Sequence, residues 1–276
     1  MNMEKLVTFQ DRGNILGVLH LPDHYQHEST PIVIYCPGMN GERYEVHRLA
    51  VKFARYLCDR GIGFFRFDYY GIGVSDGLYH EMTNTTKVSN VQHALKFLQE
   101  ENVVQAENVI LLGFSDGARI ALKTANHSAV NKVMMWSPII WDIVDDEKQI
   151  SAENKFIFHP QYKTIMKPWI GLWLGMNYFQ DYQNFQLEKE VDHFSGKLLQ
   201  IYSDDDPIAG YTWSKLQNYK PFIEKSDIHF VNKAGHLFTS VPLENILMEK
   251  TYHWILKQFN EEVSEDDHNS EEVWDR

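Results

Sequence analysis

The sequence lacks any apolar run long enough to cross a bilayer, since a spanning helix needs about 20 predominantly apolar residues. It opens with the polar stretch 1–5, which we expect not to be a signal peptide. Only two cysteines, Cys36 and Cys58, occur in 276 residues, too few for a disulfide framework, and we interpret them as reduced, buried thiols. These absences predict a cytoplasmic protein without a membrane partner.

Positive charge is also scarce, with 26 lysines and arginines against 38 acids and a net charge of −12. An acidic chain is poorly suited to phosphate backbones, which argues against nucleic acid as a natural partner. From Glu261 onward the chain carries eight acids against a single arginine. We expect this tail, residues 261–276, to be a solvated and disordered end.

Short apolar runs with the pattern of buried strands alternate with stretches of helical periodicity. Strands are predicted at residues 6–9, 15–21, 31–36, 63–67, 109–112, 130–136, 197–202 and 227–231. Amphipathic helices are predicted near residues 46–57, 83–98, 212–219 and 242–259, and another directly after residue 117. Such alternation is typical of an α/β fold in which helices cover both faces of a parallel sheet.

Histidines at positions 20, 24 and 27 are spaced closely enough to suggest metal ligands. No cysteine or acidic residue completes a recognisable ligand set around them. We therefore interpret all three as surface histidines and predict no metal site.

The predicted strand at 109–112 runs into Gly113-Phe114-Ser115-Asp116-Gly117, and a helix follows at once. A strand, a glycine-flanked serine and a helix, in that order, are the context of a nucleophile elbow. Glycines permit so tight a turn because they have no Cβ atom, while the strained serine exposes its hydroxyl. The five residues alone would equally fit a glycine-containing loop before a helix.

Acidic and histidine residues later in the chain supply the partners that a serine nucleophile needs. An aspartate cluster follows the predicted strand at 197–202, and His236 follows the last strand. All of these loops, including the one that holds Ser115, fall at the same edge of the predicted sheet. The order serine, acid, histidine is that of the α/β-hydrolase arrangement, so it favours the elbow over a plain loop.

The chain resembles an α/β-hydrolase, and within that fold the lidded cinnamoyl/feruloyl-esterase and serine-aminopeptidase-like group. The resemblance covers roughly residues 16–259. It is carried by the segments Pro37-Gly38-Met39, residues 66–77 (RFDYYGIGVSDG), Gly113 to Gly117, residues 203–208 (SDDDPI) and residues 234–238 (AGHLF).

The resemblance implies that Ser115 is the nucleophile and His236 the general base. The family's acid maps onto residues 203–208, which favours Asp206, then Asp205, with Asp204 last. Because three adjacent ionised carboxylates repel one another, we expect the unused aspartates to face solvent.

The resemblance also implies that the backbone amides of Met39 and Asp116 form the oxyanion hole. The family's oxyanion loop commonly begins His-Gly, whereas this chain has Pro37-Gly38. The carboxylate of Asp116 is favourable at a helix N-terminus but would oppose an oxyanion if it pointed the wrong way. The sequence leaves both orientations open.

Between residues 138 and 192 the alternation breaks and aromatic residues crowd together. We interpret this segment as an inserted helical, aromatic lid on a core of residues 1–137 and 193–260, and a packed helical excursion is the alternative. Trp169 and Trp173 stand four apart, so a helix would place them on one face. Together with Trp141, they are candidate contacts for an apolar or aromatic part of a substrate.

These patterns predict a serine hydrolase that cleaves a carboxylic ester through an acyl-enzyme. A thioesterase, peptidase or acyltransferase using the same residues is an alternative, and a hydrolase fold kept as a binding protein is another. The chemistry needs no cofactor and no metal. The expected partner is a small acyl ester or thioester, and a homodimer is left open.

Overall fold

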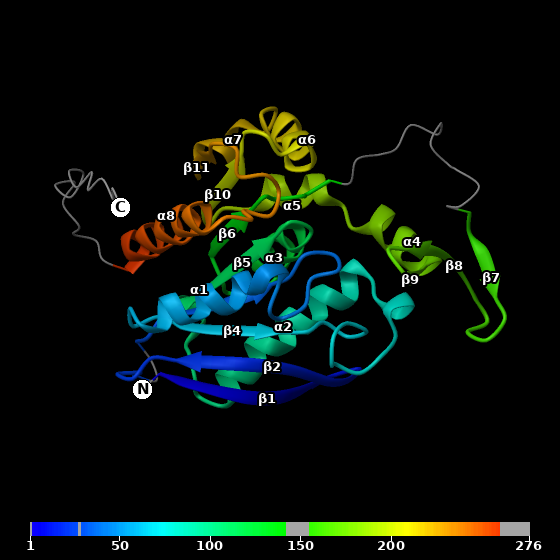
Figure 1. The fold of residues 1–276 in the computed structure, drawn as a ribbon, viewed down its shortest axis with the longest axis horizontal. Coiled ribbons are helices and arrows are strands. Elements are labelled where there is room, and N and C mark those ends of the chain that lie inside the picture. Colours follow the sequence, from blue (N-terminus) through cyan, green and yellow to red (C-terminus); the bar gives the residue numbers. More distant parts are fainter. Residues whose placement is uncertain (1, 27–28, 142–154, 260–276) are drawn as a thin grey trace.

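A mostly parallel sheet of eight strands organises the chain (Figure 1). The computed structural model describes residues 2–26, 29–141 and 155–259. The strands of this sheet are β1 (Met3–Asp11), β2 (Gly13–Leu21), β3 (Ile32–Cys36), β4 (Gly63–Phe67), β5 (Val109–Phe114), β6 (Lys132–Trp136), β10 (Lys197–Ser203) and β11 (Ser226–Val231).

The strands follow the order β1-β2-β4-β3-β5-β6-β10-β11 across the sheet. The pairs β1–β2 and β2–β4 are antiparallel, and every later pair is parallel. All residues of β3, β4 and β5 are buried, as expected of strands covered on both faces. The predicted sheet is thereby confirmed.

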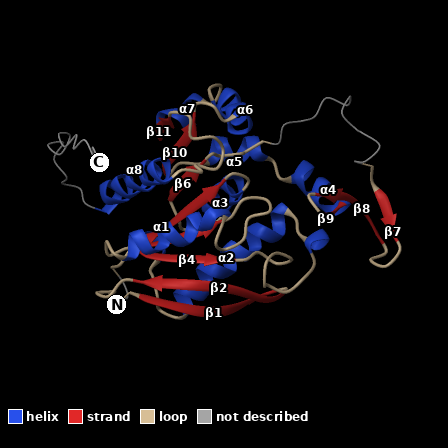
Figure 2. Cartoon of the chain, viewed as in Figure 1, coloured by secondary structure: helices blue, strands red, loops and turns tan. Residues whose placement is uncertain are grey.

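Helices cover both faces of the sheet (Figure 2). On one face α1 (Leu49–Cys58) and α8 (Val241–Phe259) pack into one apolar cluster. A second cluster lies on the other face and involves α2 (Asn84–Glu100), α3 (Gly117–Asn126), α5 (Leu187–His193), α6 (Pro207–Leu216) and α7 (Lys220–Glu224). Short 3₁₀ turns occupy Val46–Arg48, Tyr79–Glu81 and Ala106–Asn108.

Helix α6 begins five residues before the predicted start at 212. The carboxylate of Asp206 caps it by accepting the amide N–H groups of Ile208 and Ala209. Pro207 occupies the first helical position, where its missing N–H costs nothing. The helix therefore begins at the aspartate cluster. Its start is set by a capping side chain, which apolar periodicity does not reveal.

The segment expected to form a helical lid is partly a small antiparallel sheet of β7 (Ile157–His159), β8 (Thr164–Trp169) and β9 (Leu172–Gly175). In Figure 1 this sheet lies at the end of the molecule opposite to α8. Helix α4 (Met176–Asn184) follows, and α5 packs against α3. Residues 142–154 of the expected lid lie outside the described residues.

A helix that carries Trp169 and Trp173 on one face is therefore wrong. Trp169 ends β8 and Trp173 lies in β9, where it faces Pro168. Ile170 and Gly171 join these strands with φ values of 47° and 77°. Two residues at positive φ form the tight turn that matches the twist of a hairpin, so the four-residue spacing was misleading.

The interpretation of His20 as a surface residue is also wrong, because it lies in β2 and is 1% exposed. Its Nε2 accepts a hydrogen bond of 2.8 Å from Nε of Arg66. The expectation for the cysteines is confirmed, since Cys36 and Cys58 are free and buried. Burial raises the pKa of each thiol to about 12.

None of the helices among the described residues is both long and apolar enough to cross a membrane. The expected acidic tail at 261–276 lies outside the described residues.

Candidate active site

Ser115 sits in a sharp turn between β5 and α3, with φ of 54°. Its amide donates to the carbonyl of Trp136 over 2.9 Å. Its own carbonyl accepts the amides of Ala118 and Ile139, each at 3.0 Å. These bonds hold the serine in a backbone conformation that L-residues rarely adopt, as the pentapeptide predicted.

The two flanking glycines are required by close backbone approach. A Cβ atom on Gly113 would lie 2.5 Å from Cα of Ala118. On Gly117 it would lie 2.0 Å from the carbonyl oxygen of Cys36, at the end of the neighbouring strand β3. Helix α3 can therefore begin against the end of β3 only if residue 117 has no side chain.

Ser115, His236 and Asp206 come together from three loops at the same edge of the sheet. Nε2 of His236 lies 2.9 Å from Oγ of Ser115, and Nδ1 lies 2.6 Å from Oδ2 of Asp206. The hydroxyl of Ser137 donates to the carbonyl of His236 over 2.9 Å and fixes the histidine loop. His236 is thus within hydrogen-bond reach of both Ser115 and Asp206, and the roles of nucleophile, base and orienting acid for these residues stay predictions.

Asp206 is 4% exposed, and its second oxygen accepts the amides that cap α6. Burial would raise the pKa of this carboxyl group, but the contact with His236 and the two backbone amides outweigh it. The pKa therefore lies below its ordinary value, and the carboxylate is ionised at neutral pH.

Asp204 and Asp205 are exposed, as expected for the unused acids. They are nevertheless engaged with the histidine loop. Oδ1 of Asp205 accepts the amide of Gly235 over 2.8 Å, and Oδ1 of Asp204 accepts the amide of Lys233 over 2.7 Å. Both side chains thus tie the loop before His236 to the end of β10, a role that was not predicted from the sequence.

The loop at residues 37–41 lies beside the elbow, because a Cβ atom on Gly38 would be 3.4 Å from Cβ of Ser115. Within the part of the chain that the structure describes, the amide N–H groups of Met39 and Asp116 find no acceptor. Free amides beside a serine hydroxyl suit an oxyanion hole, and the assignment of both residues stays a prediction.

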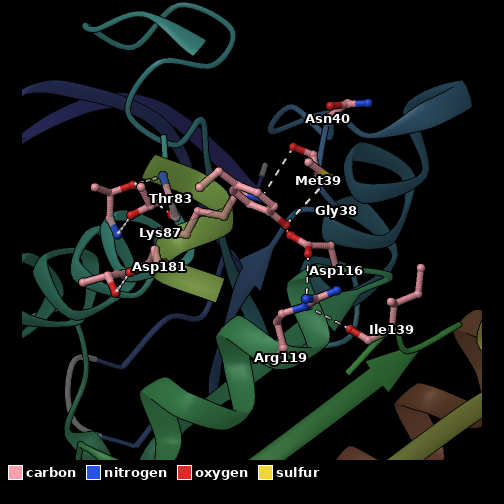
Figure 3. Close-up of polar contacts among 12 residues, drawn as sticks. Gly38, Met39, Asn40, Thr83, Lys87, Asp116, Arg119, Ile139 and Asp181 are labelled. Carbon is pink, nitrogen blue, oxygen red and sulfur yellow. Dashed lines mark hydrogen bonds and ion pairs between the residues drawn. The ribbon is translucent and has the colours of Figure 1, made fainter. Parts of the chain in front are cut away.

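The carboxylate of Asp116 is 3% exposed and is held between two cations (Figure 3). Oδ2 accepts from Nζ of Lys87 at 2.7 Å, and Oδ1 lies 3.1 Å from Nε of Arg119. Burial acts to raise the pKa of Asp116, but the ammonium and guanidinium groups hold it below the ordinary value. The sequence left the orientation of the Asp116 side chain open. In the structure it points toward Lys87 and Arg119, which compensate its negative charge.

Lys87 was absent from the predicted site, although the sequence contains a signal for it. It lies one residue before Val88 and four before Val91, on the apolar stripe of the predicted helix. A charged residue on a stripe that faces the core needs a buried partner. Helical periodicity could have marked Lys87 as unusual, but it could not have named Asp116.

The three tryptophans proposed as substrate contacts lie in different surroundings. Trp169 donates from Nε1 to Oδ1 of Asn40 over 3.3 Å, directly beside Met39. Trp141 is 4% exposed and donates to Glu188 over 3.0 Å. Trp173 packs edge-on against the His159 ring at 5.2 Å. Trp169 thus adjoins the loop at residues 37–41, and a substrate role for any of the three stays a prediction.

Residues 2–163 match the sequence profile of a family described as esterase FrsA-like. Esterase FrsA of Enterobacter sp. (strain 638) is 26% identical over 259 residues, which cover 92% of this chain and 55% of that protein. Esterase FrsA of Escherichia fergusonii is 23% identical, with coverage of 91% and 54%. The chain thus spans about half the length of the curated relatives that it matches.

Solved structures share the fold. Est1E from Butyrivibrio proteoclasticus with bound ferulic acid has a TM-score of 0.74 and 18% identity, covering 91% of this chain and 98% of that chain. The α/β hydrolase GrgF from Penicillium sp. sh18 has a TM-score of 0.71 and 16% identity, with coverage of 94% and 99%. At such identities the likeness shows the α/β-hydrolase fold.

Proposed function

The chain belongs to the FrsA-like esterase family, and on that premise we propose that it is a serine hydrolase that cleaves a carboxylic ester through an acyl-enzyme. The observation that carries the proposal is the chain of contacts from Ser115 through His236 to Asp206, at 2.9 Å and 2.6 Å. This geometry lets the imidazole accept the serine proton while the carboxylate fixes its tautomer.

In the proposed reaction Oγ of Ser115 bonds to the ester carbonyl carbon, and its proton passes to Nε2 of His236. The carbonyl oxygen becomes an oxyanion that the amides of Met39 and Asp116 stabilise. The intermediate collapses with cleavage of the ester C–O bond, and the departing alkoxide takes the proton from His236. Water then attacks the acyl-enzyme with the same proton transfers and releases the carboxylic acid.

The proposed oxyanion hole relies on the main chain. One such donor is typically worth about 2.7–4 kcal/mol of transition-state stabilisation. The replacement of the usual histidine by Pro37 at the start of the loop therefore need not abolish catalysis, because Met39 and Asp116 donate through groups that every non-proline residue has. The carboxylate of Asp116 does not oppose the oxyanion as a free anion, since Lys87 and Arg119 compensate it.

An ester with an apolar or aromatic part fits the surroundings of the loop. Trp169 reaches Asn40 from the small sheet, and Oδ1 of Asn40 also accepts the hydroxyl of Tyr79. Aromatic rings therefore flank the residue next to Met39. The ferulic acid bound to Est1E is an aromatic acid, which is consistent with such a substrate.

The test compares wild-type protein with Ser115→Ala and with the control Ser214→Ala, which removes an exposed hydroxyl on α6. The wild type and the control should hydrolyse short acyl and aryl p-nitrophenyl esters and react with a fluorophosphonate probe. Ser115→Ala should lose the probe reaction and at least about 10³-fold in rate. Unchanged turnover in Ser115→Ala would refute the assignment.

Product analysis separates the remaining enzymatic alternatives. Thioester and peptide substrates, and added alcohols or amines as competing acceptors, distinguish thioesterase, peptidase and acyltransferase activity. A protein that does not react with the fluorophosphonate at Ser115 would instead be a hydrolase fold used for binding.

A further inference from the structure

Three charged side chains, Lys87, Asp116 and Arg119, form a buried cluster behind the nucleophile elbow (Figure 3). We call it the elbow ion cluster. Lys87 is fully buried, Arg119 is 1% exposed and Asp116 is 3% exposed. Two cations face one carboxylate, so the cluster carries a net positive charge in the interior.

Stability alone is a weak explanation for such a cluster. Removing charges from water is costly, and a buried ion pair often contributes no more than well-packed apolar residues of the same volume. One member of the cluster, Asp116, directly follows Ser115 in the chain, and the proposed reaction of Ser115 develops a negative charge. A net cationic group in a water-poor site stabilises such a charge far more strongly than it would in water.

Lys87 is held firmly at the start of α2. A capping box between Thr83 and Thr86 begins the helix, with reciprocal hydrogen bonds of 2.8 Å and 3.1 Å. The amide of Lys87 donates to the carbonyl of Thr83 over 3.1 Å, and its ammonium lies 5.4 Å from the ring centre of Tyr69. The lysine stem therefore has little freedom to move its charge.

The ammonium group of Lys87 touches both residues whose amides would form the oxyanion hole. Nζ lies 2.7 Å from Oδ2 of Asp116 and 3.5 Å from the carbonyl oxygen of Met39. The carbonyl of Met39 and the side chain of Asp116 come from separate loops, after β3 and β5 respectively. One side chain from a third element thus links the two halves of the proposed oxyanion hole.

Arg119 extends the cluster to a third loop. Its Nε donates to the carbonyl of Ile139 over 3.3 Å. The amide of Ile139 in turn donates to the carbonyl of Ser115 over 3.0 Å. The cluster therefore connects the oxyanion loop, the elbow and the segment after β6 through one set of charges.

We propose that Lys87 is a positioning residue that holds the amides of Met39 and Asp116 in register and supplies compensating positive charge to the oxyanion hole. The inference rests on the proposed function. Loss of the Lys87 side chain should slow acylation without weakening ground-state substrate binding. We expect kcat to fall about 10- to 100-fold with KM nearly unchanged, which is less than the ~10²–10³-fold loss caused by deleting one donor.

The experiment compares Lys87→Met and the double variant Lys87→Met/Asp116→Asn with the control Lys123→Met. The double variant leaves no unpaired carboxylate if the single variant folds poorly, and it keeps the backbone amide of residue 116. Because Arg119 remains, it also keeps the net charge of the cluster, so that it tests positioning alone. Lys123 lies on α3, pairs with Glu190 at 3.1 Å and donates to the carbonyl of Phe185. Its removal deletes a less buried ion pair on the same helix as Arg119, away from the oxyanion loop.

Two readouts separate positioning from a merely structural role. The first is kcat and KM for a p-nitrophenyl ester, measured well below the melting temperature of each variant. The second is the affinity for a boronic acid, which adds to Ser115 as a tetrahedral anion and so needs the oxyanion hole. If Lys87 positions the donors, kcat/KM and boronate affinity fall by the same factor in the Lys87 variants, and Lys123→Met stays near wild type.

The inference is overturned if either Lys87 variant keeps kcat within about twofold of the control, or if kcat falls while boronate affinity does not. It is also overturned if neither Lys87 variant folds, because the cluster then serves folding. Failure of the proposed function looks different, since the wild type would lack esterase activity or Ser115→Ala would retain it.

Discussion

Asp206→Asn should abolish most of the activity while leaving the fold intact, because the surroundings of Asp206 dictate how an amide would sit there. Oδ1 accepts the two backbone amides of Ile208 and Ala209, at 2.9 Å and 3.2 Å. Asparagine has a single side-chain oxygen, which must stay at that position. The opposite orientation would leave two amide donors facing a third, at about 1–3 kcal/mol for each unsatisfied group.

The NH₂ group of the substituted side chain would then face the imidazole of His236. Nδ1 must accept from that NH₂ group, so the neutral imidazole carries its proton on Nε2. That proton points at Oγ of Ser115, and the ring can no longer take the serine proton. The same Asp-to-Asn change in a Ser-His-Asp triad lowers kcat about 10⁴-fold, or about 5 kcal/mol. Asparagine caps helices about as well as aspartate, so the start of α6 should survive.

The assay is p-nitrophenyl ester hydrolysis beside thermal unfolding, with Asp205→Asn as the matched control. Oδ1 of Asp205 accepts from Ser203 and from the amide of Gly235, and an asparagine oxygen can do both. We expect the control to keep activity within a few-fold of wild type. The assignment of Asp206 as the residue that sets the tautomer is refuted if Asp206→Asn keeps more than about a tenth of the activity, far above the ~10⁻⁴ expected. It is also refuted if Asp205→Asn loses more activity than Asp206→Asn.

Two further predictions concern the scaffold. Burial and the neighbouring Arg66 lower the pKa of His20 to about 4, so the unfolded chain binds more protons below about pH 6.5, and stability should fall by about 2 kcal/mol between pH 7 and pH 5. His20→Gln, which keeps an acceptor for Arg66, should show a smaller fall in the free energy of unfolding between pH 7 and pH 5, measured by urea unfolding. An equal fall in both proteins would show that His20 does not cause it. Gly117→Ala should destabilise by about 3 kcal/mol or prevent folding, because its Cβ would meet the Cys36 carbonyl at 2.0 Å. Gly210→Ala, where a Cβ meets nothing within 4 Å, is the control in thermal melts, and equal melting temperatures would count against the steric argument.

Local patterns in the sequence were sufficient for the core of the fold. The strand at 63–67 was predicted at its observed bounds, and the order of Ser115, the aspartate cluster and His236 followed from the loops that hold them. Such patterns can be recognised because burial of both faces of a strand, or of one face of a helix, requires apolar residues at positions close together in the sequence. The turn at Ser115 was suggested by glycines 113 and 117, which lie within it, but the preference for an elbow over a plain loop came from the order of the acid and the histidine.

Contacts between residues far apart in the chain could not be predicted from the sequence. The spacing of Trp169 and Trp173 suited a helix, but the strand partners across the Ile170-Gly171 turn made a hairpin. His20 was predicted to be a surface residue because its buried hydrogen-bond partner, Arg66, lies on another strand, 46 positions away in the chain.

The α/β alternation and the loops that hold Ser115, the aspartate cluster and His236 could be predicted from the sequence, because each of these segments is defined by residues a few positions apart. The contact of Asp206 with His236, and the contacts of Lys87 with Asp116 and the carbonyl of Met39, became known only from the folded structure. Lys87 and Asp116 are 29 positions apart in the chain. Their contact exists because α2 and the elbow pack on the same face of the sheet, and packing over such distances leaves no local pattern.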